Sequence, residues 1–206
     1  QVIAPVYAAV AYHPQEEPLS AQRIWHKEIK FERVVLPEPG KRFFRKTFML
    51  SNQPIKDARV LVSVDHAYTL YINGEEVAKC EDWKKVGKLE VSQYLRSGKN
   101  VIAIEGINEG KIANPAGVLF VMKISYNSGD PIFVNSNQSW ISTAEQPGTG
   151  WHSITYNDES WLKVRNYGTA NWGKLIDFSF EPRNGAFARA SLVKQHPFMK
   201  ALGRPT

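Results

Sequence analysis

The dipeptide Asn73-Gly74, set between two short segments of alternating side chains, most strongly restricts how this chain can fold. Tyr68 to Ile72 precedes the dipeptide and Glu75 to Cys80 follows it, and each segment has the length of one strand. Asparagine and glycine both accept the positive φ of a two-residue type I′ turn. The pair therefore predicts a tight β-hairpin.

Other short segments also have the residue pattern of strands. The segment 42–50 is rich in aromatic residues, and in 58–65 every second residue is apolar. The segments 99–107 and 118–124 alternate in the same way. The predicted core consists of the apolar residues on one face of these strands: Phe44, Phe48, Leu70, Ile72, Ile102, Ile104, Phe120 and Met122. Many short strands without a long amphipathic helix inside 24–180 predict an all-β sandwich or barrel.

The ends of the chain have a different composition. Residues 1–20 are predicted to be a linker, residues 21–180 the β-sandwich, and residues 181–206 a linker or the start of a next domain with a helix-like segment at 187–202. No stretch approaches the length of a membrane span, and no basic leader precedes the apolar start. We expect a fragment of a larger protein whose export signal lies outside this sequence.

Charge and cysteine content limit the function classes. The net charge is +6 and the pI about 9.3, which raises nucleic acid or an acidic polymer as partners. The basic residues are spread along the chain, however, so a solvated surface is the favoured reading and no nucleic-acid partner is predicted. The single cysteine, Cys80, excludes an internal disulfide and a cysteine-cluster metal site.

Enzyme motifs are missing from the sequence. We find no nucleophile elbow, no zinc-protease motif, no glycine-rich phosphate loop and no haem attachment motif. The carboxylates of Asp65 and Glu105 could form a glycosidase pair only if they faced one cleft. The sequence therefore predicts a protein that is not an enzyme.

The order of these motifs resembles a known family. It is carried by Ile24-Trp25, 44–48, 58–65, 70–74, Tyr94-Leu95 and 98–103. The pattern resembles the galactose-binding-like jelly-roll domains of bacterial α-L-rhamnosidases and β-galactosidase-like hydrolases. The tetrads 137–140 and 158–161, which both end in Ser-Trp, are similar to segments of those domains.

The resemblance implies an all-β, galactose-binding-like β-sandwich (jelly roll) with a sugar-binding or scaffold role, sometimes with bound calcium. The tail 189–205 is similar to a stretch of large planctomycete surface proteins that also carry cytochrome-like domains. This second resemblance implies a large exported parent protein. We expect that parent to be bacterial, and to be extracellular, on the cell surface or periplasmic. Neighbouring domains of that parent chain are expected partners.

Strand direction predicts which loops share one end of the sandwich. If 58–65 runs upward, Asp65-His66 lies at the top, because consecutive strands run antiparallel. The loops 81–85 and 108–114 return to the same end. The predicted carbohydrate-binding residues are the polar and aromatic residues of these loops: Asp65, His66, Trp83, Asn108, Glu109 and Asn114.

This set combines an indole with hydrogen-bonding groups, and sugars need both an apolar face and polar partners. The alternative is a set of ordinary polar loops around a half-buried Trp83. Trp140, Trp151 and Trp161 are likewise either packed indoles after a turn or stacking platforms.

Calcium is an optional cofactor in this reading, because Asp65, Glu105, Asn108 and Glu109 offer oxygen ligands but form no contiguous calcium loop. The favoured function is a non-catalytic carbohydrate-binding module that holds a larger exported protein on a polysaccharide. The alternative is a structural or interaction domain of the same fold, which predicts buried tryptophans and an exposed apolar patch.

Overall fold

The computed structural model describes residues 20–169 and 178–179. The linker predicted at 1–20, except for Ser20, lies outside these residues, and so do the helix-like segment 187–202 and the tail 189–205. The domain boundaries and the planctomycete similarity therefore stay predictions.

The described chain is built mainly from strands, and a turn of 3₁₀ helix, Ser92–Tyr94, lies between two of them. The strands are β1 (Gln22–Trp25), β2 (Ile29–Lys30), β3 (Arg33–Val34), β4 (Gly40–Leu50), β5 (Ile55–Val64), β6 (Ala67–Ile72), β7 (Glu75–Cys80), β8 (Gly87–Glu90), β9 (Gly98–Asn108), β10 (Val118–Tyr126), β11 (Ile132–Asn135), β12 (Ile141–Thr143), β13 (Leu162–Lys163) and β14 (Arg165–Thr169). No helix of the described residues has the length and apolarity to cross a membrane.

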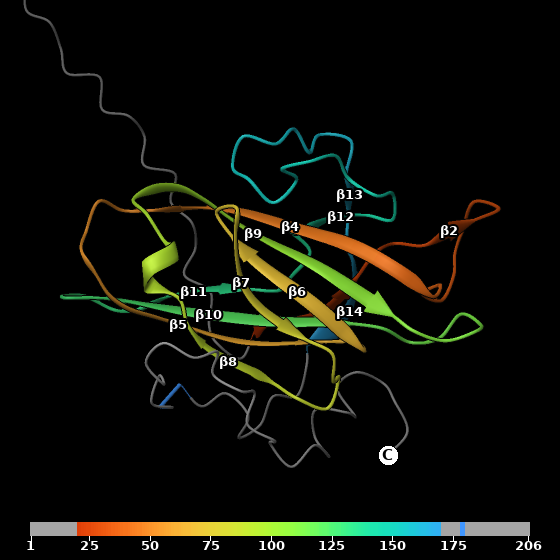
Figure 1. Cartoon of the computed structure of the whole chain (residues 1–206), viewed down its shortest axis with the longest axis horizontal. Coiled ribbons are helices and arrows are strands. Elements are labelled where there is room, and N and C mark those ends of the chain that lie inside the picture. Colours follow the sequence, from red (N-terminus) through yellow and green to blue (C-terminus); the bar gives the residue numbers. More distant parts are fainter. Residues whose placement is uncertain (1–19, 170–177, 180–206) are drawn as a thin grey trace, which may run out of the picture.

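Two antiparallel six-stranded sheets form the two layers of a sandwich (Figure 1). The first sheet has the order β14-β1-β10-β5-β8, with β11 also paired to β10. The second has the order β13-β12-β4-β9-β6-β7. Strands β2 and β3 form a separate hairpin. The all-β sandwich predicted from the sequence is confirmed.

Alternation along the strands places the core between the two sheets. Val60, Val62 and Val64 of β5 point inward together, as their spacing predicts. All eight residues predicted to form the core belong to the main cluster of buried apolar side chains. Burying each such side chain contributes about 1.5–3 kcal/mol, so this layer supplies most of the driving force for folding.

The turn at Asn73-Gly74 has the predicted backbone conformation, with φ of 53° at Asn73 and 98° at Gly74. The asparagine side chain does more than permit the turn. Its Nδ2 donates to the carbonyl of Tyr94 and to Oδ1 of Asn100, both at 2.7 Å, and its Oδ1 accepts from the amide of Val101. Asn73 thus fixes the hairpin to the 3₁₀ turn and to the start of β9.

The two Ser-Trp tetrads form similar turns. The amide of Trp140 donates to the carbonyl of Asn137, and the amide of Trp161 donates to the carbonyl of Asp158. Trp140 is fully buried in the main core, with its Nε1 bonded to the carbonyl of Asn135 at 2.8 Å. Trp161 is only half-buried, so the turn-then-indole reading is confirmed for both, with different burial.

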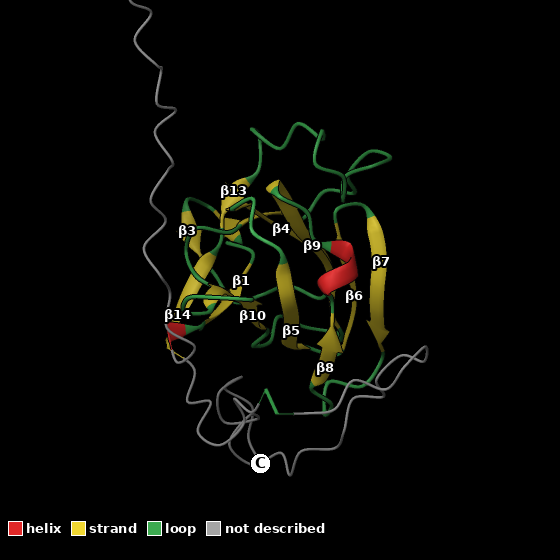
Figure 2. Ribbon diagram, turned by 90° about the vertical axis from the view of Figure 1, so that its left-hand side faces the viewer, coloured by secondary structure: helices red, strands yellow, loops and turns green. Residues whose placement is uncertain are grey.

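A second, smaller cluster lies on the outer face of the sheet that contains β4 and β9. Segment 144–161 covers this face (Figures 1 and 2) and packs Trp151 against Phe43 and Ala103. Arg45 is buried beneath the segment, with Nε 2.7 Å from Asp158 Oδ2 and its guanidinium bonded to the carbonyls of Trp151 and Ser153. Trp151 is therefore a packing residue and not an open stacking platform.

Candidate functional site

Three loops meet at one end of the sandwich, on the right of Figure 1. Val64, at the end of β5, pairs with Val118, at the start of β10. Ala67 of β6 pairs with Ile107, near the end of β9. The loop 81–86 joins Cys80, opposite Tyr68, to Gly87, opposite Val62. The strand directions inferred from the sequence are therefore confirmed, and the loops 65–66, 81–86 and 109–117 share this end.

Asp65 and His66 form the centre of this loop end. Asp65 is fully buried, and its amide donates to the carbonyl of Gly117 at 3.0 Å. His66 has a φ of 55°, a left-handed conformation that non-glycine residues seldom adopt. Its Nδ1 lies 3.0 Å from Asp65 Oδ2 and 3.1 Å from the backbone nitrogen of Glu109. The imidazole, with a side chain that is 19% exposed, therefore joins the first loop to the third.

The two asparagines of the predicted set hold the loops in place. Asn108 is 1% exposed, and its Nδ2 donates to the carbonyls of Pro37 and Glu38 at 3.4 and 3.2 Å. Asn114 donates from its side chain to the carbonyls of Glu109 and Ile112, both at 3.1 Å. In both side chains the amide nitrogen thus donates its hydrogen bonds to backbone carbonyls.

The segment 35–39 also reaches this end, although the sequence reasoning did not include it. Besides the contacts from Asn108, the carbonyl of Pro37 accepts the backbone amide of Asn114 at 2.9 Å. These are long-range backbone contacts, which no local pattern in the sequence signals. The segment therefore acts as a fourth wall of the loop end.

The remaining two residues of the set are open to solvent to different degrees. Glu109 is exposed, and its backbone amide lies 3.1 Å from Nδ1 of His66. Trp83 is half-buried, and the Nζ of Lys84 lies 5.6 Å from the centroid of its ring. Trp83 shares this end of the sandwich with the other five residues.

Below Trp83, the base of the loop 81–86 is rigidly packed. Burial, with a smaller contribution from Cys80, raises the pKa of Tyr68 far above its ordinary value. A Cβ at Gly87 would overlap the Tyr68 hydroxyl and lie 2.8 Å from Val62 Cγ1. The loop that carries Trp83 therefore ends at a position, Gly87, that only glycine fits.

The four oxygen-bearing residues suggested as calcium ligands do not assemble into one site. Glu105 points to the outer face of the sheet, where its Oε1 pairs with the Nζ of Lys41 at 2.7 Å. Within residues 20–169 and 178–179, no group of three or more His, Cys, Asp or Glu side chains is placed to hold a metal ion. The predicted ligand set therefore does not fit calcium as a unit.

Asp65 and Glu105, the two carboxylates considered as a possible glycosidase pair, are separated in the same way. Asp65 is fully buried, and Glu105 lies on the outer face in its ion pair with Lys41. The two carboxylates thus do not face a common cleft.

No protein-family model matches the chain.

Comparisons with known proteins agree with the fold. An α-L-rhamnosidase of Streptomyces avermitilis is 30% identical over 144 residues, which is 65% of this chain and 14% of that protein. The crystal structure of a Streptomyces avermitilis α-L-rhamnosidase complexed with L-rhamnose superposes with a TM-score of 0.65 and 25% identity. That match covers 78% of this chain and 16% of the enzyme.

A fungal lectin has the same fold. The lectin of Pleurotus ostreatus, solved in complex with GalNAc, matches with a TM-score of 0.61 at 23% identity, over 76% of this chain and 46% of the lectin. The present chain corresponds to only a small part of the rhamnosidases. It is a β-sandwich domain that resembles one segment of the α-L-rhamnosidases and shares its fold with this lectin.

Proposed function

We propose that this chain is a non-catalytic carbohydrate-binding domain of a larger exported protein, and that it binds glycan through the loops at the Asp65–His66 end. The observation that carries the proposal is the construction of that end. Buried Asp65 and Asn108 fix loops from both sheets, and a strained, partly exposed His66 lies beside exposed Glu109. Strained backbone at a loop tip is a feature of binding sites.

The chemistry of the exposed groups suits a sugar. The imidazole edge of His66 and the carboxylate of Glu109 can bond hydroxyl groups, and the half-buried Trp83 offers an apolar ring at the same end. Lys84, placed beside that ring, adds a positive charge. An acidic sugar unit could stack on the Trp83 ring and pair its carboxylate with Lys84.

The comparisons support the same proposal. The lectin of the same fold was solved with GalNAc, and the rhamnosidase was solved with L-rhamnose. Binding sites on loops over a rigid scaffold are common in such folds. The separated Asp65 and Glu105 carboxylates support a domain without catalysis, because a glycosidase needs two carboxyl groups on one cleft.

One observation favours the alternative of a structural or interaction domain. Three of the five tryptophans among the described residues, Trp25, Trp140 and Trp151, are buried. Apolar side chains are also exposed on the hairpin β2–β3. The alternative predicts both features, and it predicts no response to any glycan.

A broad glycan and polysaccharide array, read with calcium and with a chelator, tests the proposal. We expect binding to one class of glycan, and we expect Trp83→Ala to abolish it while the melting curve stays nearly unchanged. Glu109→Ala should weaken binding by about tenfold, the usual cost of a lost hydrogen bond to a charged group. Glu75→Ala, an exposed carboxylate at the opposite end, is the matched control.

One result would count against the proposal, and another would change how it is tested. An absence of binding to neutral and acidic glycans would favour the alternative, a structural or interaction domain. A large loss of stability in Trp83→Ala would identify the indole as core, and the exposed Glu109 variants would then have to carry the test alone.

A further inference from the structure

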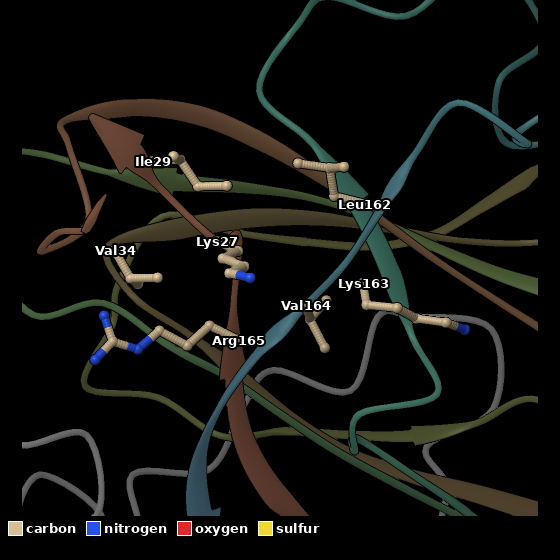
Figure 3. Close-up of a pocket in the computed structure, with 7 residues that line it drawn as sticks. All are labelled: Lys27, Ile29, Val34, Leu162, Lys163, Val164 and Arg165. Atoms are coloured by element: carbon tan, nitrogen blue, oxygen red, sulfur yellow. The ribbon is translucent and has the colours of Figure 1, made fainter. Parts of the chain in front are cut away.

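A groove lies between the hairpin β2–β3 and the strands β13 and β14 (Figure 3), and none of the six residues predicted to bind carbohydrate lines it. Its volume is about 390 Å³. Four aliphatic side chains and three cationic side chains line it: Ile29, Val34, Leu162, Val164, Lys27, Lys163 and Arg165. The lining contains no carboxylate and no aromatic ring.

Three of the four aliphatic residues of the groove are open to solvent, whereas Val164 is buried. Ile29, Leu162 and Val34 are 52%, 47% and 44% exposed. They belong to strands of two residues each, and a two-stranded hairpin has little stability of its own. The hairpin is held by backbone and side-chain contacts at its base, including Val35 N to Glu28 O and Arg165 Nη1 to Val35 O. Its apolar face is therefore presented outward and not used for folding.

The tip of the hairpin also exposes an apolar side chain. Phe31 is 96% exposed, and both Phe31 and Glu32 have positive φ, 48° and 61°. Residues with a Cβ pay of order 1 kcal/mol or more for that conformation. The backbone at Phe31 is strained, and its phenyl ring buries almost no surface within this domain. An exposed aromatic ring of this kind is typical of a side chain that docks on a partner.

The charge of the groove defines the partner. Within the described part of the chain, Lys27, Lys163 and Arg165 form no ion pair with a carboxylate. The nearby carboxylates are already engaged, because Glu38 pairs with Lys30 at 2.6 Å and Glu28 pairs with Arg42 at 2.6 Å. An anionic ligand would supply these three cationic side chains with carboxylate partners.

The lining also distinguishes between classes of anion. Sugars and bases stack on aromatic rings, and the groove has none. Aliphatic walls instead accept aliphatic side chains, and Lys and Arg recognise acidic motifs in peptides. The tail 182–206 of this chain carries five basic residues and no acidic one, so its charge has the wrong sign.

From these contacts we propose that the groove is a docking site for an extended acidic peptide segment of a partner protein, one that alternates aliphatic and carboxylate side chains. Its aliphatic side chains lie against Ile29, Val34 and Leu162. Its carboxylates pair with Lys27 and Arg165. Phe31 adds a contact beyond the groove.

Fluorescence anisotropy with the full chain tests this assignment. The probe is a labelled peptide of alternating valine and glutamate. The control peptides alternate valine with lysine and serine with glutamate. We expect the valine–glutamate peptide to bind at least about tenfold more tightly than either control, because both charge and apolar contact are required.

Matched variants locate the site. Lys27→Glu should weaken binding by about tenfold, whereas Lys99→Glu, the same charge change at an exposed position of β9, should change it by less than about twofold. Ile29→Ser should weaken binding, and Met49→Ser, which alters a similarly half-exposed apolar side chain of β4, should not.

Four results would overturn the assignment. They are equal binding of the serine–glutamate peptide, equal loss in Lys27→Glu and Lys99→Glu, and equally tight binding of polygalacturonate, which would make the groove a saccharide site. The fourth is tighter peptide binding when Glu16 and Glu17 are replaced by lysine, because the chain's own N-terminal segment would then be the occupant.

Discussion

At the scale of single residues, the loop end depends on a backbone conformation that its side chain does not favour. His66 adopts a φ of 55° between the buried Asp65 and the first residue of β6. Only glycine enters this region without cost, and asparagine or aspartate enters it at a small cost. The imidazole contacts with Asp65 and Glu109 offset part of the strain.

Two substitutions of His66 separate the backbone from the ring. Both His66→Gly and His66→Ala remove the imidazole, but only glycine relaxes the left-handed backbone. We expect His66→Gly to be more stable than His66→Ala by about 1 kcal/mol in urea unfolding. This order reverses the usual ranking of alanine above glycine. Equal stabilities would show that the positive φ is not kept in solution.

At the scale of elements, the two sheets pack so closely at Gly87 that no side chain fits there. Gly87 starts β8 against Val62 of β5 and beneath the hydroxyl of Tyr68 from the opposite sheet. Both sheets therefore converge on this residue. The loop 81–86 owes its starting position to that contact.

A double-mutant cycle tests this packing. Gly87→Ala should cost about 1–3 kcal/mol, because the new methyl group overlaps the Tyr68 hydroxyl and overpacks the core. Tyr68→Phe removes the hydroxyl, so the double variant should recover part of that loss. Additive free energies of unfolding would mean that the two residues do not meet.

The elements also show which features local sequence can predict. Asn73-Gly74 and the alternating strands β5, β9 and β10 were predicted because turn chemistry and a period of two are local properties. The hairpin β2–β3 was missed because its turn uses Phe31 and Glu32 at positive φ, without glycine or asparagine. Burial of Trp151 was not resolved because its partners, Phe43 and Ala103, are distant in sequence.

The same division applies to the candidate site. Strand direction correctly placed the three loops together, since antiparallel order follows from the connections alone. It did not show that Asp65 and Asn108 face inward, because the alternation of side chains ends where a strand ends. The wall formed by 35–39 depends on contacts across about 70 residues, which no pattern within a strand encodes.

At the scale of the whole molecule, a buried histidine connects the two sheets. His26 follows β1 of the first sheet, and its Nδ1 lies 3.0 Å from the Oγ of Ser142 in β12 of the second sheet. Burial, and then the charge of Arg42, lowers the pKa of His26 to about 4. The imidazole is therefore neutral in the folded protein over most of the acidic range.

This shift makes stability depend on pH in a defined window. Between pH 6.5 and about 4, the unfolded chain takes up a proton on His26 and the folded chain does not. The free energy of unfolding should therefore fall as the pH falls through this window, by about 2 kcal/mol. His26→Gln should flatten the curve of urea-unfolding free energy against pH. An unchanged slope in the variant would assign the effect to other groups.

The central claim is that glycan binds at the Asp65–His66 end of the sandwich. The most direct measurement is a titration of the ¹⁵N-labelled protein with the glycan that the array selects, followed by amide chemical shifts. We predict shifts confined to the loops 65–66, 81–86 and 109–117 and to the adjoining segment 35–39, with the opposite turns at Asn73-Gly74 and Gly98 unchanged. Shifts confined instead to the hairpin β2–β3, or to the opposite turns, would contradict the proposed site.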